Sequence, residues 1–233
     1  MQSIFSRFDR IQIVNLKRRT DRRRQMEREL RRVGLSVGDR VAFFEALQFD
    51  NPGPFARVGS NGAYHSHLAI LKEAAANGES VLILQDDCDF LPVAMDYELP
   101  EGGDIFYGGY YASDPKDLHN SEIIGAHFMG FSREAASKAA AYLEALLDPD
   151  FPPDEKAAAV PGFDPAIRPP VDGALVWFRR AHPELRTEFA MLGVQRPSRT
   201  EIGDLALLDR IWGIKHLATW ARSARYAVRR YLG

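Results

Sequence analysis

An unbroken apolar run at residues 81–84, VLIL, most constrains what this chain can fold into. A strand that is apolar at every position is typical of the centre of a sheet that is covered on both faces, as in α/β proteins. The run is followed directly by QDDCD at residues 85–89. Polar residues at the carboxyl end of a central strand lie where open α/β sheets form their ligand crevice. The run therefore predicts both an α/β fold and the place of its site.

The rest of the chain predicts strands that alternate with helices around this central strand. The expected strands are rich in β-branched or aromatic residues, and the expected helices repeat their apolar positions every three or four residues. The strands are residues 11–16, 41–46, 104–107 and 123–131, and the helices are the segment between Thr20 and Gly34, 64–76 and 133–147, with a proline-rich loop at 148–171. Thr20 can cap the first helix and Gly34 can end it. The pattern favours a Rossmann-type mixed sheet flanked by helices.

Composition limits the class of protein and its partners. A chain of 233 residues, 45% of them hydrophobic, can bury the core of one domain. The net charge of -2 argues against nucleic acid as a partner. The single cysteine, Cys88, cannot form an intramolecular disulfide, which suits a reducing compartment. The N-terminus lacks the pattern of a signal peptide, and no stretch reaches the ~20 apolar residues that span a bilayer. We therefore expect a cytoplasmic protein.

The last residues of the chain, 203–233, form a basic and amphipathic segment. Its aromatic and aliphatic residues interleave with arginines and lysines, a pattern typical of a helix that lies on an anionic membrane surface. The same pattern suits a helix that packs on the domain with its arginines in solvent. We divide the chain into a catalytic domain at 1–202 and a helical tail at 203–233, and peripheral contact with the inner membrane stays one of two interpretations of the tail.

The acidic residues after the central strand are candidate metal ligands. Mg²⁺ and Mn²⁺ prefer oxygen ligands and commonly bind through one or two carboxylates together with substrate phosphates. Asp86, Asp87 and Asp89 could supply these oxygens, and the ion would offset negative charge on a leaving diphosphate. The alternative is a solvated turn whose aspartates cap the following segment.

Five groups of short motifs occur in order between residues 11 and 202. They are IVNL with RRTDR (13–16 and 18–22), Gly62 with SHL (66–68), VLIL running into DD (81–84 and 86–87), GAHF with SR (125–128 and 132–133), and PVD with QRP (170–172 and 195–197). In order and spacing they resemble the motifs of glycosyltransferase family 25, whose enzymes build lipooligosaccharides and lipopolysaccharides.

The resemblance implies a GT-A-like fold and the inverting transfer of a hexose, such as galactose, from a UDP-sugar to a glycan or lipid-linked glycan acceptor. We expect Asn15, Leu16, Arg19, Arg22, Ser66, His67, Gln85 and Asp86 to bind the donor, and Asp87 and Asp89 to hold a divalent cation, Mn²⁺ or Mg²⁺. The chain departs from the family at Gln85, where the family has glutamate, so a metal-independent or weakened enzyme is an alternative. A lone histidine such as His67 is more often a structural hydrogen-bonding residue.

Inverting transfer needs a base that takes the proton of the acceptor hydroxyl. Asp172 is the first candidate because it stands in the PVD motif, and Asp89 is the second. An aspartate that follows prolines is also an ordinary helix cap. Two other functions stay open. One is a degenerate, non-catalytic protein that binds nucleotide sugars or glycans, which Gln85 favours, and the other is a metal-dependent phosphatase or nuclease.

Overall fold

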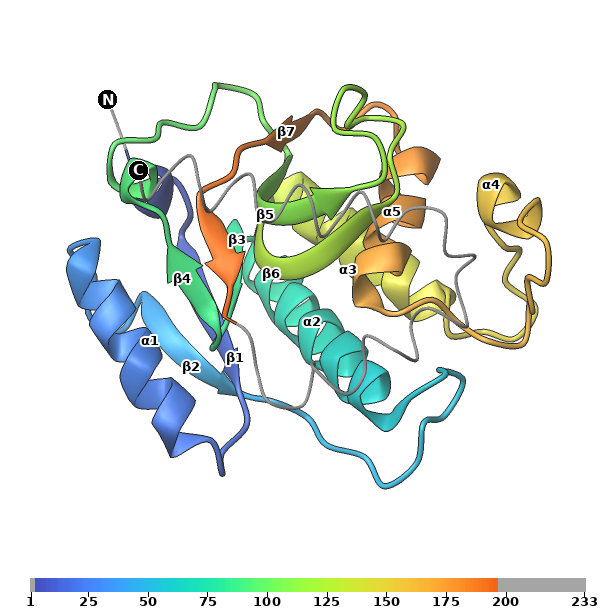
Figure 1. Ribbon diagram of the computed structural model, residues 1–233, viewed down its shortest axis with the longest axis horizontal. Coiled ribbons are helices and arrows are strands. Elements are labelled where there is room, and N and C mark those ends of the chain that lie inside the picture. Colours follow the sequence, from blue (N-terminus) through green and yellow to red (C-terminus); the bar gives the residue numbers. More distant parts are fainter. Residues whose placement is uncertain (1–2, 197–233) are drawn as a thin grey trace. The chain divides into compact units, whose positions relative to one another are not determined.

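The computed structural model describes residues 3–196 and is built on a six-stranded mixed sheet (Figure 1). Its strands are β1 (Arg10–Asn15), β2 (Val41–Glu45), β3 (Val81–Gln85), β5 (Ile105–Ala112), β6 (Ile123–Phe131) and β7 (Thr187–Phe189). Their order across the sheet is β2-β1-β3-β6-β5-β7. β1 is parallel to β2 and β3, β6 is antiparallel to both β3 and β5, and β7 is parallel to β5. The predicted α/β fold with a mixed sheet flanked by helices is confirmed.

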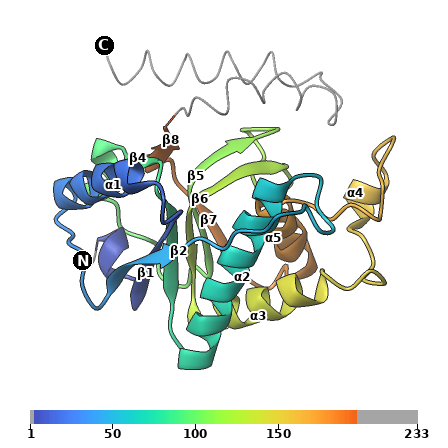
Figure 2. The same cartoon turned by 90° about the horizontal axis from the view of Figure 1, so that it is seen from below.

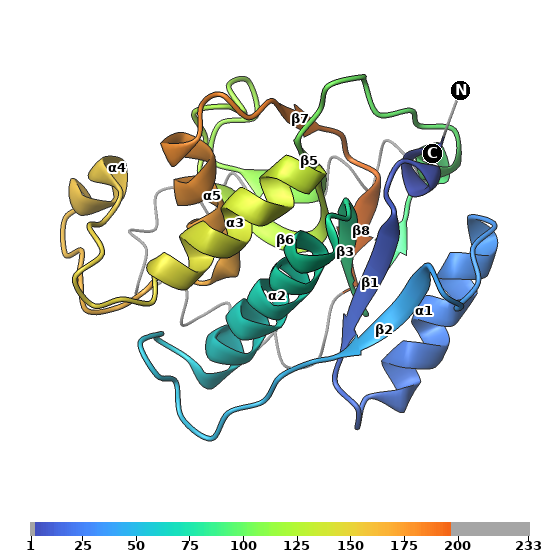
Figure 3. The ribbon, with the colours of Figure 1, turned by 180° about the vertical axis from the view of Figure 1, so that it is seen from behind.

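Two apolar layers cover the sheet, one on each face. The central strand β3 shows this directly, because Leu82 and Leu84 belong to one core cluster while Val81 and Ile83 belong to the other. Helix α1 (Thr20–Arg32) contributes to the core cluster that contains Leu82 and Leu84, which we call the first. Helices α2 (Val58–Asn77), α3 (Arg133–Ala145) and α5 (Val171–Ala181) contribute to the second and lie together on their face of the sheet (Figures 2 and 3). Every residue of the VLIL run is fully buried, as its composition predicts.

Helix α5 was not predicted from the sequence, and the boundaries of α1, α2 and α3 follow the sequence signals with two exceptions. Thr20 is the first residue of α1 and makes no capping bond, since Arg19 occupies the cap position, so the predicted Thr20 cap is wrong. Helix α2 begins at Val58 rather than at residue 64, because its first turns, which carry two glycines, are held by packing. A Cβ at Gly62 would lie 2.6 Å from the Leu47 carbonyl oxygen, so the chain after β2 crosses α2 in direct contact with its backbone.

A second, two-stranded sheet is absent from the sequence prediction. It pairs β4 (Cys88–Phe90) with β8 (Gly193–Gln195) in antiparallel register, with Cys88 opposite Gln195. Each strand has three residues, too few for alternation to be recognised. The proline-rich segment is mostly loop, as predicted, with one short helix, α4 (Glu155–Ala158). Two 3-10 helices, Ile4–Ser6 and Pro92–Met95, complete the described elements.

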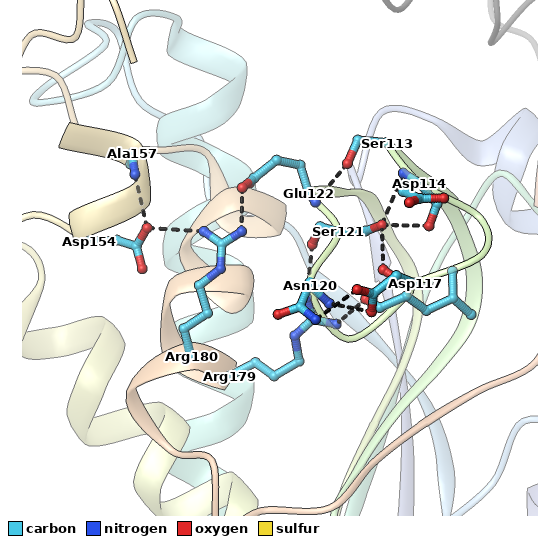
Figure 4. A network of polar contacts seen from close by, with 11 residues as sticks. Ser113, Asp114, Asp117, Asn120, Ser121, Glu122, Asp154, Ala157, Arg179 and Arg180 are labelled. Carbon is cyan, nitrogen blue, oxygen red and sulfur yellow. Dashed lines mark hydrogen bonds and ion pairs between the residues drawn. The ribbon is translucent and has the colours of Figure 1, made fainter. Parts of the chain in front are cut away.

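Two arginines of α5 hold the connection between β5 and β6 (Figure 4). Arg179 is buried and donates from Nη1 to the Leu118 carbonyl at 3.1 Å and from Nη2 to the Ser121 carbonyl at 2.9 Å. Arg180 forms ion pairs with Glu122 and with Asp154, the latter at 3.0 Å. This connection is therefore fixed to α5 and to the start of α4 rather than free in solvent.

Met1–Gln195 forms one compact unit, and the rest of the chain falls in a second unit of which only Arg196 is described. The predicted tail at 203–233 and its membrane contact lie outside the described residues. Within residues 3–196 no helix combines the length and apolar character needed to cross a bilayer.

Candidate functional site

The order of the strands makes the carboxyl ends of β1 and β3 the switch point of the sheet. From β1 the chain passes through α1 to β2 on one side of β1, and it later returns through α2 to β3 on the other side. The two crossovers therefore separate between β1 and β3, and in open α/β sheets ligands bind at such a switch point. Asn15 ends β1, and Asp86 follows the last residue of β3.

Polar side chains meet at this point from three parts of the chain. Asn15 Nδ2 donates to Asp86 Oδ2 at 2.7 Å. Arg22 Nη1 lies 2.9 Å from Asp86 Oδ1 and 2.9 Å from Asp87 Oδ2. The two aspartates are buried, and the Arg22 side chain is 18% exposed. Two carboxylates and one guanidinium thus form a shielded cluster, in which ion pairs are stronger than at the open surface.

Arg22 reaches the cluster because α1 starts directly after β1. It stands in the first turn of the helix, whose axis begins beside the carboxyl edge of the sheet. Arg19, just before the helix, forms an ion pair with Asp21 at 2.8 Å. That hydrogen bond is the main reason why the pKa of Arg19 is raised, and the charges of Asp86 and Asp87 raise it further. Arg19 therefore lies within electrostatic reach of both aspartates.

Gln195 joins the cluster through the small second sheet. The register of β4 and β8 sets it opposite Cys88, and its Nε2 lies 3.4 Å from Asp87 Oδ2. Gln195 belongs to the QRP motif but was not among the predicted site residues. The motif pointed to Gln195, but the strand pairing that brings Gln195 to Asp87 was not predicted.

A second polar group forms around Asp172 on the face of the sheet that carries α2 and α5. Asp172 accepts hydrogen bonds from the Gly125 amide at 3.2 Å and the Gly173 amide at 3.0 Å. His67 Nε2 lies 3.3 Å from the Ala126 carbonyl oxygen. Because β6 runs antiparallel to β3, with Phe128 opposite Leu84, its residues 125–126 lie at the edge where β3 ends. Asp172 is thereby brought to the same edge of the sheet as the aspartate cluster.

Burial changes the pKa values of both Asp172 and His67. Desolvation raises the pKa of Asp172 above that of an ordinary aspartate, although the amide bonds and the nearby His67 act against it. Desolvation lowers the pKa of His67, and its two backbone contacts and Asp172 act against that. A carboxylate with a raised pKa is a stronger base than a solvated one, as a proton acceptor in catalysis requires.

Three of the predicted site residues have local structural contacts. Ser66 Oγ accepts from the Leu47 amide at 2.9 Å and donates to the Gly62 carbonyl at 2.7 Å. His67 is fully buried, and its Nδ1 lies 2.9 Å from the Ala63 carbonyl. The Leu16 carbonyl accepts from the Arg19 amide in the turn before α1. These contacts fit the structural interpretation of His67 and hold α2 and the β1–α1 turn in place.

Gln85 and Asp89, which were also predicted, flank the aspartate cluster. Gln85 ends β3 opposite Val14 and is half-buried. Asp89 lies in β4 opposite Val194, and its charge acts on Arg32. Within residues 3–196 no three His, Cys, Asp or Glu side chains group as a metal site, and a cation held by Asp87, Asp89 and a diphosphate stays a prediction.

The sequence matches no known family model and no curated protein sequence. Among solved structures, the chain is similar to a glycosyltransferase involved in the glycosylation of the major capsid of PBCV-1, with 12% identity and a TM-score of 0.45. The similarity covers 82% of this chain and 96% of that one. A likeness of this degree leaves the function to be argued from the site itself.

Proposed function

We propose that this protein is a glycosyltransferase with a GT-A-like fold that transfers a hexose, galactose in the first instance, from a UDP-sugar to a glycan acceptor with inversion. The observation that carries the proposal is the way the motifs resembling family 25 come together. The first and third motif groups and the QRP half of the fifth meet in the cluster of Asn15, Arg22, Asp86 and Gln195. The second and fourth groups and the PVD half of the fifth meet around Ala126 and Asp172. Motifs that were noted only for their order in the chain are thus neighbours in space.

The aspartate cluster, which contains Asn15, Arg22 and Gln195 as well, suits the donor. It stands at the switch point of the sheet, where open α/β folds bind nucleotides. Arg22 offers a forked set of N–H groups that matches phosphate oxygens, and Asn15 and Gln195 offer amides that can bond hydroxyl groups. A UDP-sugar presents both kinds of group, a diphosphate and a set of hydroxyls.

The polar group around Asp172 suits the acceptor. In the proposed reaction the acceptor hydroxyl oxygen attacks the anomeric carbon on the face opposite the diphosphate. The bond from that carbon to the phosphate oxygen breaks, its electron pair leaves with UDP, and Asp172 takes the hydroxyl proton. Burial favours this role because it makes the Asp172 carboxylate more basic. The acceptor we propose is a lipooligosaccharide, a lipopolysaccharide or another lipid-linked glycan, met in the cytoplasm at the inner membrane.

The test is transfer with a defined donor and a product of known stereochemistry. The purified chain is incubated with UDP-galactose or UDP-glucose and a truncated lipooligosaccharide, and UDP release and product linkage are measured. We expect acceptor-dependent UDP release, a β-linked product from the α-linked donor, and loss of transfer in Asp172→Asn. The same change at exposed Asp164, whose side chain accepts a bond from the Ala166 amide, is the matched control.

Other outcomes separate the proposal from its rivals. Binding of UDP-sugar without transfer to any glycan would favour a non-catalytic binding protein instead. In that case Gln85→Glu, which restores the acid of the family, tests whether a lost carboxylate is the reason. Hydrolysis of simple phosphate esters that is lost in Asp87→Ala would favour the phosphatase interpretation and would contradict ours.

A further inference from the structure

The arrangement of Arg22 between two aspartates has the form of a cation site whose cation is part of the chain. A single nitrogen, Nη1, lies 2.9 Å from a carboxylate oxygen of Asp86 and 2.9 Å from one of Asp87. Two adjacent carboxylates after a central strand are the type of ligand that presents Mg²⁺ or Mn²⁺ to a diphosphate. Here the positive charge that bridges them is a guanidinium group.

Three of the four carboxylate oxygens of the cluster are already engaged by N–H groups of the protein. Asp86 Oδ2 accepts from Asn15 at 2.7 Å, and Asp86 Oδ1 accepts from Arg22. Asp87 Oδ2 faces both Arg22 and Gln195. An ion bound through these oxygens would have to displace protein N–H groups and leave the Arg22 charge beside it without its partners. The neighbouring side chain that could add a ligand, Gln85, is an uncharged amide.

Arg22 has donors left for a ligand. Both of its ion pairs within residues 3–196 are made by Nη1. The guanidinium group also carries N–H groups on Nε and Nη2, and a planar fork of this kind binds phosphate oxygens in pairs. The charges of Asp86 and Asp87 raise the pKa of Arg19, so a second guanidinium group lies near the two aspartates.

We propose that Arg22, held in place by Asp86 and Asp87, is the cation of this site and binds the donor diphosphate in place of a divalent metal ion. The inference rests on the proposed function and gives it a specific form, which is metal-independent binding of a nucleoside diphosphate. The aspartates then orient a guanidinium group rather than an ion, and the ion pairs keep its long side chain in one conformation. This also accounts for Gln85, because a site without a metal does not need a third carboxylate.

The experiment is titration calorimetry of UDP into the full chain, once with EDTA and once with Mn²⁺. We expect the dissociation constant with EDTA to agree within about twofold with that in Mn²⁺. Arg22→Lys keeps the charge but loses the fork, and it should weaken binding on the order of tenfold or more, the effect of losing charge-assisted hydrogen bonds. Arg24→Lys, on the exposed face of the same helix, should bind like the wild type. Circular dichroism checks that both variants are folded.

The remaining outcomes overturn the inference in distinguishable ways. UDP binding that requires Mn²⁺ and is abolished by EDTA would overturn the inference but leave the proposed function in place. Binding that Arg22→Lys and Arg22→Gln both leave unchanged would do the same. No binding of UDP or pyrophosphate under either condition would overturn the inference and the proposed function together.

Discussion

Asn15 and Asp86, which are 71 residues apart in the sequence, are joined by a hydrogen bond of 2.7 Å from Nδ2 to Oδ2 across the carboxyl ends of β1 and β3. The bond is buried, and Asn15 Nδ2 also lies 3.3 Å from the Arg19 carbonyl oxygen. The amide therefore ties the end of β1 both to the aspartate cluster and to the turn that leads into α1. It links the geometry of the aspartate cluster to the folding of the two parallel strands β1 and β3.

The first prediction concerns this bond. Asn15→Asp replaces a donor by an acceptor of the same shape and sets a carboxylate against Asp86. We expect a loss of about 1–3 kcal/mol in the free energy of unfolding, the usual effect of a buried polar group without its partner, together with weaker UDP binding. Urea unfolding and calorimetry measure the two effects.

The matched control for that substitution is Asn51→Asp. The side chain of Asn51 is exposed and accepts a bond from the Gly53 amide through its oxygen, a role that aspartate retains. An equal loss of stability in both variants would show that the bond between Asn15 and Asp86 contributes nothing of its own.

The second prediction concerns the pH dependence of transfer through Asp172. Because burial raises its pKa, the rate kcat/KM should fall with decreasing pH at a value above the ordinary aspartate pKa of 3.8. Asp172→Asn should lower kcat by about 10² to 10⁴, the usual contribution of a general base, with little change in UDP binding. Steady-state kinetics over the acidic range measures both.

Stability has the opposite dependence on pH at this residue. A raised pKa in the folded state means that the folded chain holds the proton more tightly than the unfolded chain. The contribution of Asp172 to the free energy of unfolding is therefore present below its unfolded pKa and is lost as pH rises through its folded pKa. Relative to Asp172→Asn, the wild type should therefore be more stable near pH 4 than near pH 7. An acidic limb in the rate that persists in Asp172→Asn would assign the base to another residue.

The third prediction concerns acid unfolding and His127. Burial lowers the pKa of His127 to about 4, although a contact with the Gly193 carbonyl acts against it. The unfolded chain takes up this proton below about pH 6.5, while the folded chain does not. The contribution to stability is therefore present above pH 6.5 and is lost as pH falls toward 4, by about 3 kcal/mol in total. Urea unfolding at several pH values measures the slope.

A variant isolates the histidine from the other titrating groups. His127→Asn removes the ionisable ring, so its stability should depend less on pH between 6.5 and 4 than that of the wild type. His65→Asn, at a half-buried position of α2, is the comparison. If the ring proton signals of His127 titrate near pH 6.5 in NMR spectra, the burial argument is wrong.

The parts of the fold that the sequence predicts are those with long, uniform patterns. β3 and β6 are recognised because apolar residues dominate both strands. The predicted end of α2 at residue 76 lies within one residue of its end at Asn77, after which Gly78 takes a positive φ of 64°. β4 and β8 are missed because each depends on pairing with a strand about a hundred residues away. The start of α2 is missed because tertiary packing at Gly62 overrides the poor helix propensity of its first turns.

The candidate site divides in the same way. That Asn15 and Asp86 lie together follows from the rule that parallel strands end at one edge. That Arg22 bridges both aspartates depends on the direction in which α1 leaves β1, which no local pattern contains. The contacts of Ser66 and His67 likewise depend on where α2 packs.

The fourth prediction concerns the β5–β6 connection, which Arg179 holds from α5. Its guanidinium group makes hydrogen bonds to the Leu118 and Ser121 carbonyls and lies 5.3 Å from the Phe189 ring centroid. Arg179→Lys keeps the charge but cannot reach both carbonyls in the plane of one fork. We expect a loss of about 1–3 kcal/mol in the free energy of unfolding.

Hydrogen exchange distinguishes a local effect from a global one. If Arg179 fixes this connection, the amides of residues 118–122 should exchange faster in Arg179→Lys by a larger factor than those of β3, because local opening then precedes global unfolding. Arg133→Lys, at an exposed site in the first turn of α3, should change neither. Uniformly faster exchange across the sheet would show instead that Arg179 stabilises the whole core through α5 and does not act on the connection in particular.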